Sequence, residues 1–124
     1  MLDIALPVLN KEQTKKNVLQ ALKKYKLYVS SISEEDRKAI EAGHVVAEKK
    51  MKRYLYVQEF EKVLENSLNF TEKQIIREGY IEADEHNWIK MSQSLNLSKT
   101  PYYKKRDKAF YKLAYVFGIE VEEE

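Results

Sequence analysis

Basic side chains are concentrated between residues 99 and 117. This segment holds six Lys and Arg residues against one Asp, a net charge of +5, whereas the whole chain carries only +2. Lys104, Lys108 and Lys112 lie four residues apart, so on a helix they would form one row of ammonium groups. Such a row can neutralise the phosphates of duplex DNA. Other side chains of the same segment can reach the edges of bases: Lys99, Thr100, Tyr103 and Arg106.

The residues that usually support catalysis or metal binding form no recognisable pattern. The chain has no Cys, which excludes a thiolate metal site, a Cys nucleophile and a disulfide. Its two histidines, His44 and His86, are far apart, and the acids beside His86 (Glu82, Asp84 and Glu85) match no established ligand spacing. Three scattered glycines form no phosphate-binding loop. We therefore expect no enzyme, no metal site and no cofactor.

A short turn between two helices would position the basic segment. Trp88, Met91 and Leu95 fall at i, i+3 and i+7, which predicts one apolar stripe on a first helix. Asn96 follows, and Asn tolerates the left-handed conformation that often ends a helix. The pattern indicates a helix-turn-helix.

The second helix has two possible starts. Ser98 could cap it, or Thr100 could cap it with Pro101 in the first helical position, which we favour because a residue before proline resists the helical conformation. The expected inner stripe contains Tyr102, Ala109, Leu113 and Val116, with Phe110 and Phe117 beside it. The expected outer face carries Lys99, Tyr103, Lys104, Asp107, Lys108 and Tyr111. A helix with an apolar inner face and a basic, aromatic outer face suits the major groove of DNA.

Two helical patterns occupy the N-terminal half. Asn10 or Thr14 can cap the first, which runs to about Tyr28 with an apolar stripe of Val18, Leu22, Tyr25 and Val29. Ser33 can cap the second, which keeps roughly helical spacing to about residue 69. That run is longer than a typical helix of a small domain. We therefore expect one of three arrangements for this run: a hairpin with the first helix, an arm between helices, or a break near Gly43.

A shorter helix is predicted between this run and the helix-turn-helix. Thr71 is its candidate N-cap, and Gly79 is a candidate for its end. A polar link follows, in which Asp84 or Asn87 can cap the helix that starts at Trp88. The acidic tail 120–124 is expected to be solvated and frayed.

Composition and length favour a small helical protein. With 124 residues, 34% charged residues, three Gly and two Pro, the chain predicts one all-α domain. We expect a helical arm or hairpin over residues 1–69, followed by a helix-turn-helix region over residues 70–124. There is no signal-sequence pattern, and no apolar run approaches the ~20 residues of a membrane span. We therefore expect a cytoplasmic protein without a membrane partner.

Several segments resemble the ArpU family of phage-type transcriptional regulators. They are Leu97-Ser98, Tyr102-Tyr103-Lys104, Lys108-Ala109-Phe110-Tyr111-Lys112-Leu113-Ala114 and Gly118-Ile119-Glu120-Val121, with a weaker likeness at Thr14-Lys15-Lys16-Asn17-Val18. The C-terminal half also resembles region 4 of sigma factors, which reads the promoter −35 element. Lys105 occupies a position where these families usually place an inward apolar residue, so either its stem extends to solvent or the helix is slightly rotated.

The resemblance implies a phage or prophage transcriptional regulator that binds duplex DNA and controls late or lysis genes. Its N-terminal helices would pack on the helix-turn-helix, form a homodimer or contact RNA polymerase. The alternative is a non-catalytic helical adaptor whose basic helix faces an acidic protein instead of DNA. A Tyr-rich basic surface can also stack the bases of single strands, although helical tyrosines more often pack their rings.

Overall fold

The computed structural model describes residue 2 and residues 4–123. The helices in this part of the chain are α1 (Lys11–Ser31), α2 (Glu34–Glu41), α3 (Glu48–Ser67), α4 (Phe70–Ile76), the π-helical turn η1 (Arg77–Ile81), α5 (Trp88–Leu95) and α6 (Lys99–Phe117). The described residues form no strand, only an isolated antiparallel bridge between Leu9 and Glu122. The predicted all-α class is confirmed. No helix among these residues is long and apolar enough to cross a membrane.

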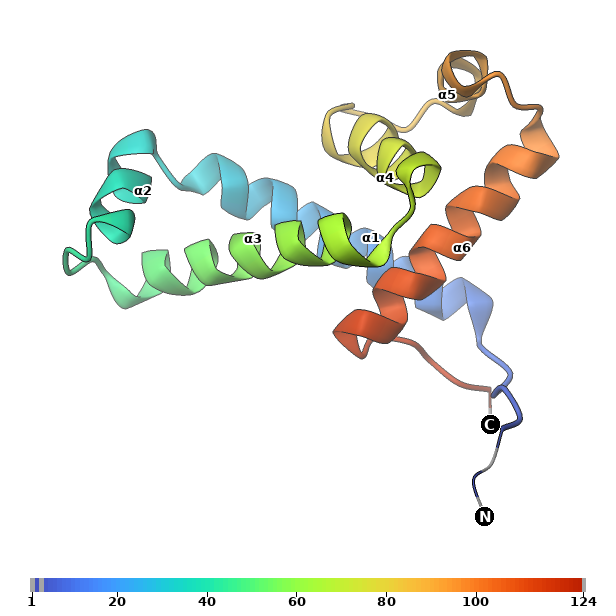
Figure 1. Ribbon diagram of the computed structural model, residues 1–124, viewed down its shortest axis with the longest axis horizontal. Helices are drawn as coiled ribbons and strands as arrows, with labels where there is room; N and C mark the ends of the chain where they lie inside the picture. Colours follow the sequence, from blue (N-terminus) through green and yellow to red (C-terminus); the bar gives the residue numbers. More distant parts are fainter. Residues whose placement is uncertain (1, 3, 124) are drawn as a thin grey trace.

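The N-terminal half folds back on itself. Helices α1 and α3 lie side by side as an antiparallel hairpin, with α2 at its far end (Figure 1). The long helical run expected from Ser33 is split by residues 42–47, where Gly43 adopts a φ of 78°. Side chains disfavour that left-handed backbone, so glycine suits this position. Both the hairpin and the break near Gly43 therefore occur.

Side-chain caps set where these helices begin. The Asn10 side chain accepts a hydrogen bond from the Gln13 backbone N–H, so Asn10, and not Thr14, caps α1. Ser33 and Asp36 form a capping box at α2. Asn69 and Glu72 form another at α4, so the predicted Thr71 cap is wrong. Asn69 is the better cap because Glu72 stands three residues after it, which allows the reciprocal hydrogen bonds of a capping box.

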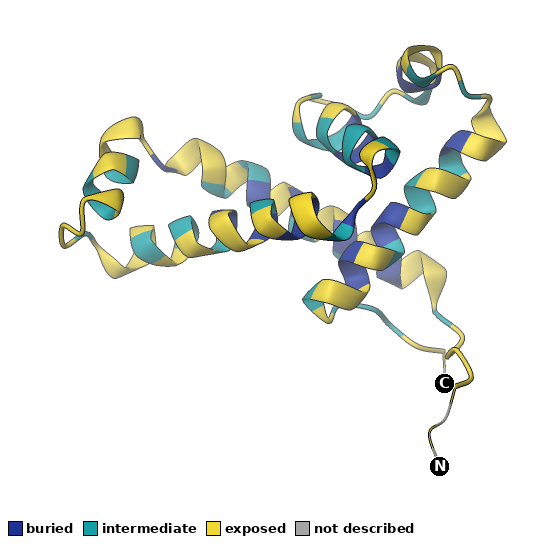
Figure 2. Ribbon diagram, viewed as in Figure 1, coloured by how far each residue is buried: buried dark blue, intermediate teal, exposed yellow. Residues whose placement is uncertain are grey.

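The main core joins both halves of the chain. Helix α6 packs against α1, α3 and α4, and its dark-blue buried face in Figure 2 turns toward them. Phe60 on α3 stacks on Tyr25 of α1 at a ring distance of 4.5 Å and on Phe117 of α6 at 5.0 Å. Leu113 is 1% exposed in the same cluster. Regions 1–69 and 70–124 thus share one hydrophobic core.

Two expectations about the edges of this core are wrong. Val29 and Val116 were placed in the inner stripes, yet they are 36% and 52% exposed. Val116 sits at the margin of its stripe, where helical rotation turns the side chain out of the interface, and Val29 lies in the last turn of α1.

The C-terminal tail is held in place, which corrects the expectation that it frays. The Asn10 N–H donates to the Val121 carbonyl and the Glu123 N–H to the Val8 carbonyl, each at 2.8 Å. Thr14 is fully buried, and its hydroxyl accepts a hydrogen bond from the Val121 N–H at 3.0 Å. Main-chain pairing with the residues just before α1 therefore anchors the tail up to Glu123. Glu124 lies outside the described residues.

Candidate nucleic-acid interface

Helices α5 and α6 are joined by the three residues 96–98. Asn87 caps α5 through a hydrogen bond from the Lys90 N–H. Asn96 ends it in the left-handed conformation, with φ 55° and ψ 46°, which confirms the expectation. The Leu97 N–H then donates to the Ser92 carbonyl at 2.8 Å and closes the corner. Leu97 also packs with Trp88 against a second small cluster formed by Ile75, Met91 and Tyr102.

The favoured start of α6 is wrong by two residues. Ser98 is the N-cap and Lys99 is the first helical residue, so Pro101 occupies the third helical position. The first N–H groups of a helix have no intrahelical partner, and proline therefore sacrifices no hydrogen bond there. Thr100 is helical here even though the proline ring that follows it disfavours that conformation.

The outer face of α6 carries a group of unpaired cations. Thr100, Lys104, Lys105 and Lys108 are all exposed, and none of these lysines forms an ion pair with a described residue. Lys105 therefore extends to solvent. The Lys99 ammonium lies over the Trp88 ring at 5.2 Å, which fixes it beside α5. We define the exposed basic face as Thr100, Lys104, Lys105 and Lys108.

The acid on α6 does not neutralise this face. Asp107 turns toward α1, where its Oδ2 lies 3.3 Å from the Lys15 ammonium. Its Oδ1 accepts hydrogen bonds from the Arg106 guanidinium. Asp107 is therefore paired away from the exposed basic face, as Glu72 is by Lys112.

Arg106 differs from the expectation that it reaches base edges. Its Nη2 lies 2.7 Å from Asp107 Oδ1, and its Nη1 donates to the Tyr80 hydroxyl at 3.2 Å. The guanidinium also lies 4.7 Å from the Tyr103 ring and 5.0 Å from the Phe110 ring. Its side chain is only 17% exposed. Arg106 falls about 100° from Lys105 around the helix, and this rotation directs it inward.

Tyr103 lies at the edge of the packed region, although it was expected on the outer face. It is half-buried, and its ring makes edge contacts with Tyr102 at 5.1 Å and His86 at 6.2 Å. The Arg106 guanidinium covers its ring. Tyr103 therefore shields the seam between α6 and the link before α5.

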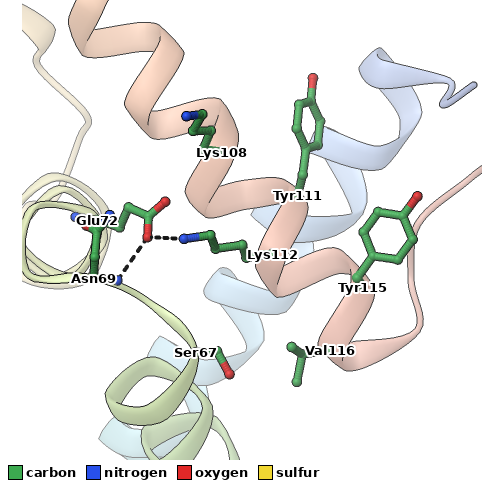
Figure 3. A pocket seen from close by; sticks show the side chains of 8 residues that line it. All are labelled: Ser67, Asn69, Glu72, Lys108, Tyr111, Lys112, Tyr115 and Val116. Carbon is green, nitrogen blue, oxygen red and sulfur yellow. Dashed lines mark hydrogen bonds and ion pairs between the residues drawn. The ribbon is translucent and has the colours of Figure 1, made fainter. Parts of the chain in front are cut away.

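Lys112 is occupied by an interaction that sequence reasoning missed. Its ammonium lies 2.7 Å from Oε1 of Glu72, which is 1% exposed (Figure 3). The same oxygen accepts a hydrogen bond from the Asn69 N–H at 2.9 Å. Lys112 therefore neutralises a buried carboxylate instead of lying free for a phosphate. The spacing of Asn69 and Glu72 was the available signal, because a capping box directs the Glu side chain back toward the helix start.

His86 is part of the packing under the turn. Its ring stacks on Tyr80 at 4.5 Å, and its Nε2 lies 2.5 Å from the Tyr102 hydroxyl. Burial, together with the nearby charge of Arg106, lowers the pKa of His86. No group of three or more His, Cys, Asp and Glu residues in the described chain could hold a metal ion.

No protein-family model, curated protein or solved structure matches this chain.

Proposed function

We propose that this protein binds duplex DNA through the exposed basic face of α6. The observation that carries the proposal is that Lys104, Lys105 and Lys108 are exposed on the outer face of α6 and form no ion pair with a described residue. Binding of lysines to phosphates releases counterions and is therefore favourable at low salt. The first half of α6 and the adjoining α5 lie at one end of the molecule, away from α2 (Figure 1). A duplex can approach this end without meeting the hairpin tip.

The proposed DNA contacts would be of two kinds: contacts to phosphates, which position the protein, and contacts to base edges, which read the sequence. Lys104, Lys105 and Lys108 would bind phosphates, which set the register of the protein on DNA without reading sequence. Thr100 lies in the first turn of α6, the part of a recognition helix that enters the major groove most deeply. Its hydroxyl can donate to or accept from a base edge. Lys99 precedes it, and its ammonium would have to exchange the contact with the Trp88 ring for a hydrogen bond to a base edge.

The ArpU resemblance extends this proposal to a biological role. It supports a phage or prophage transcriptional regulator that acts in the cytoplasm and controls late or lysis genes. The likeness to sigma region 4 supports a contact with RNA polymerase. The α1–α3 hairpin would then serve as the surface for polymerase or for a second copy of the chain.

The test compares two triple variants that lose the same charge. One replaces Lys104, Lys105 and Lys108 by Ala, and the control replaces the exposed lysines Lys23, Lys49 and Lys62. Affinity for a mixed-sequence duplex is measured by fluorescence anisotropy at low salt. We expect the α6 variant to bind at least about a hundredfold more weakly than the control, since three phosphate contacts are lost. Equal losses would overturn the proposed interface. Wild type that binds polyglutamate but no duplex would favour the acidic-partner adaptor.

A further inference from the structure

A groove lies between α6 and the junction of α3 with α4. Its cavity has a volume of about 660 Å³, enough for a small organic ligand (Figure 3). The residues lining it are Ser67, Asn69, Glu72, Lys108, Tyr111, Lys112, Tyr115 and Val116. A second cavity of about 350 Å³ shares Asn69, Glu72 and Lys108 with it and continues toward Lys104 and Lys105. The two together follow α6 for most of its length.

Glu72, one of the residues lining the groove, has a carboxylate oxygen without a hydrogen-bond donor among the described residues. Glu72 is 1% exposed and extends from α4 toward α6 (Figure 3). Its Oε1 accepts from Asn69 and Lys112, but its Oε2 is buried and has no partner among the described residues. A buried acceptor without a donor costs free energy, and the cost is larger for a charged group. A ligand that brings an N–H group to Oε2 would remove that cost.

The groove is also lined by cations and aromatic rings. Lys108 forms no ion pair with a described residue, and its four-carbon stem can rotate without backbone movement. Lys104 and Lys105 add two more ammonium groups at the adjoining cavity. Tyr115 and Val116 are 46% and 52% exposed, and Tyr111 is half-buried, so together they offer apolar contact area. These side chains suit an anionic ligand that also has a flat apolar body.

We infer that this groove binds a nucleotide whose base carries an exocyclic amino group. The amino group would donate to Glu72 Oε2, the base would lie against Tyr115 and Val116, and the phosphate would contact Lys108. A free cation would be repelled by the surrounding lysines, and a simple phosphate has no apolar body to lie against Tyr115 and Val116. The same chemistry belongs to a free nucleotide and to an unpaired nucleotide in a single strand. The site shares Lys108 with the proposed duplex interface, whereas Thr100 does not line it.

The discriminating comparison removes only the amino group. AMP and purine riboside 5′-monophosphate, which lacks the exocyclic amine, are titrated into the full chain by calorimetry. We expect AMP to bind at least about tenfold more tightly, since each ~1.4 kcal/mol is a factor of ten and a hydrogen bond to a charged acceptor contributes at least about that much. The variant Glu72→Gln should abolish that preference. Lys108→Ala should weaken both ligands alike, because it removes the phosphate contact common to them.

A single-stranded tetramer of dA serves as the second arm. Binding much tighter than AMP would identify an unpaired nucleotide in a strand as the source, and comparable binding would identify the free nucleotide. Equal affinity of wild type for AMP and the amine-free analogue, or no binding of either at millimolar concentration, would overturn the inference. If Glu72→Gln lowers the melting temperature so far that the variant is unfolded, the comparison of AMP with the amine-free analogue on wild type is the deciding test. No duplex enters these titrations, so their failure leaves the proposed function untouched.

Discussion

Lys108 and Lys112 lie one helical turn apart, and replacing each by Ala should affect different properties. Lys108 is exposed without an ion-pair partner, whereas Lys112 is paired with buried Glu72. Lys108→Ala should therefore weaken duplex binding and leave stability nearly unchanged. Lys112→Ala should lower the free energy of unfolding and leave the salt dependence of duplex binding nearly unchanged.

The magnitudes follow from burial. A hydrogen bond between charged groups is worth about 1.5–3 kcal/mol. The Lys112 side chain is 45% exposed while that of Glu72 is 2% exposed, so water screens one partner only. Discounting for this screening, we expect Lys112→Ala to cost about 1–2 kcal/mol. Lys108→Ala should stay within about 0.5 kcal/mol, as exposed positions usually do. It should reduce the slope of log Kobs against log salt by about 0.9, the effect of one lost phosphate contact.

Urea denaturation followed by circular dichroism measures the first quantity, and duplex titration at several salt concentrations measures the second. Lys62→Ala, an exposed lysine on α3, is the control and should change neither. The reasoning is refuted if Lys112→Ala lowers the salt slope as much as Lys108→Ala does and leaves stability intact. That result would mean that Lys112 is free for phosphate and that its pairing with Glu72 contributes nothing.

Three further predictions concern the fold. Leu113→Ala should cost about 2–5 kcal/mol because Leu113 is 1% exposed, whereas Val116→Ala, at 52% exposure, should cost less than about 1 kcal/mol; equal losses in urea would show that the helical phase is wrong. Asn96→Ala should lower the melting temperature, since Ala resists a φ of 55°, while Asn96→Gly should not; the reverse order would exclude the left-handed turn. The pKa of His86 is lowered by burial and by Arg106, so the unfolded chain binds the proton more readily and stability should fall as pH drops below about 6.5, the ordinary value for His. His86→Gln should remove this loss of stability at low pH, and His44→Gln, at an exposed position, should not. Identical profiles of stability against pH for the two variants would contradict the assignment of the loss to His86.

The features that sequence predicted well are those set by local chemistry. The Ser33 side chain caps the helix that follows it directly, and Asn96 adopts a left-handed backbone that its residue type tolerates, so both roles can be read without knowing the tertiary structure. The inner positions of Tyr102 and Leu113 follow from helical spacing alone. The all-α class follows from the scarcity of glycine and proline.

The parts of the site that sequence missed depend on partners far along the chain. Lys112 looks like Lys108 in sequence, and only the packing of α4 on α6 brings Glu72 to it across 40 positions. Arg106 is drawn inward by Tyr80, which is 26 positions away. A cation can therefore be assigned to a surface from periodicity, but whether it is free depends on the fold. The position of Tyr103 on the seam follows from Arg106 and His86 in the same way.

Mapping the duplex contact by amide chemical-shift changes would test the proposed interface most directly. A ¹⁵N-labelled sample of the full chain is titrated with a short duplex at low salt. We predict that the largest shifts fall on residues 99–108 of α6 and on the turn 96–98, while the hairpin tip around α2 stays unchanged. Shifts concentrated on α2 and the adjoining ends of α1 and α3, or no shifts at all, would contradict the proposal that α6 contacts DNA.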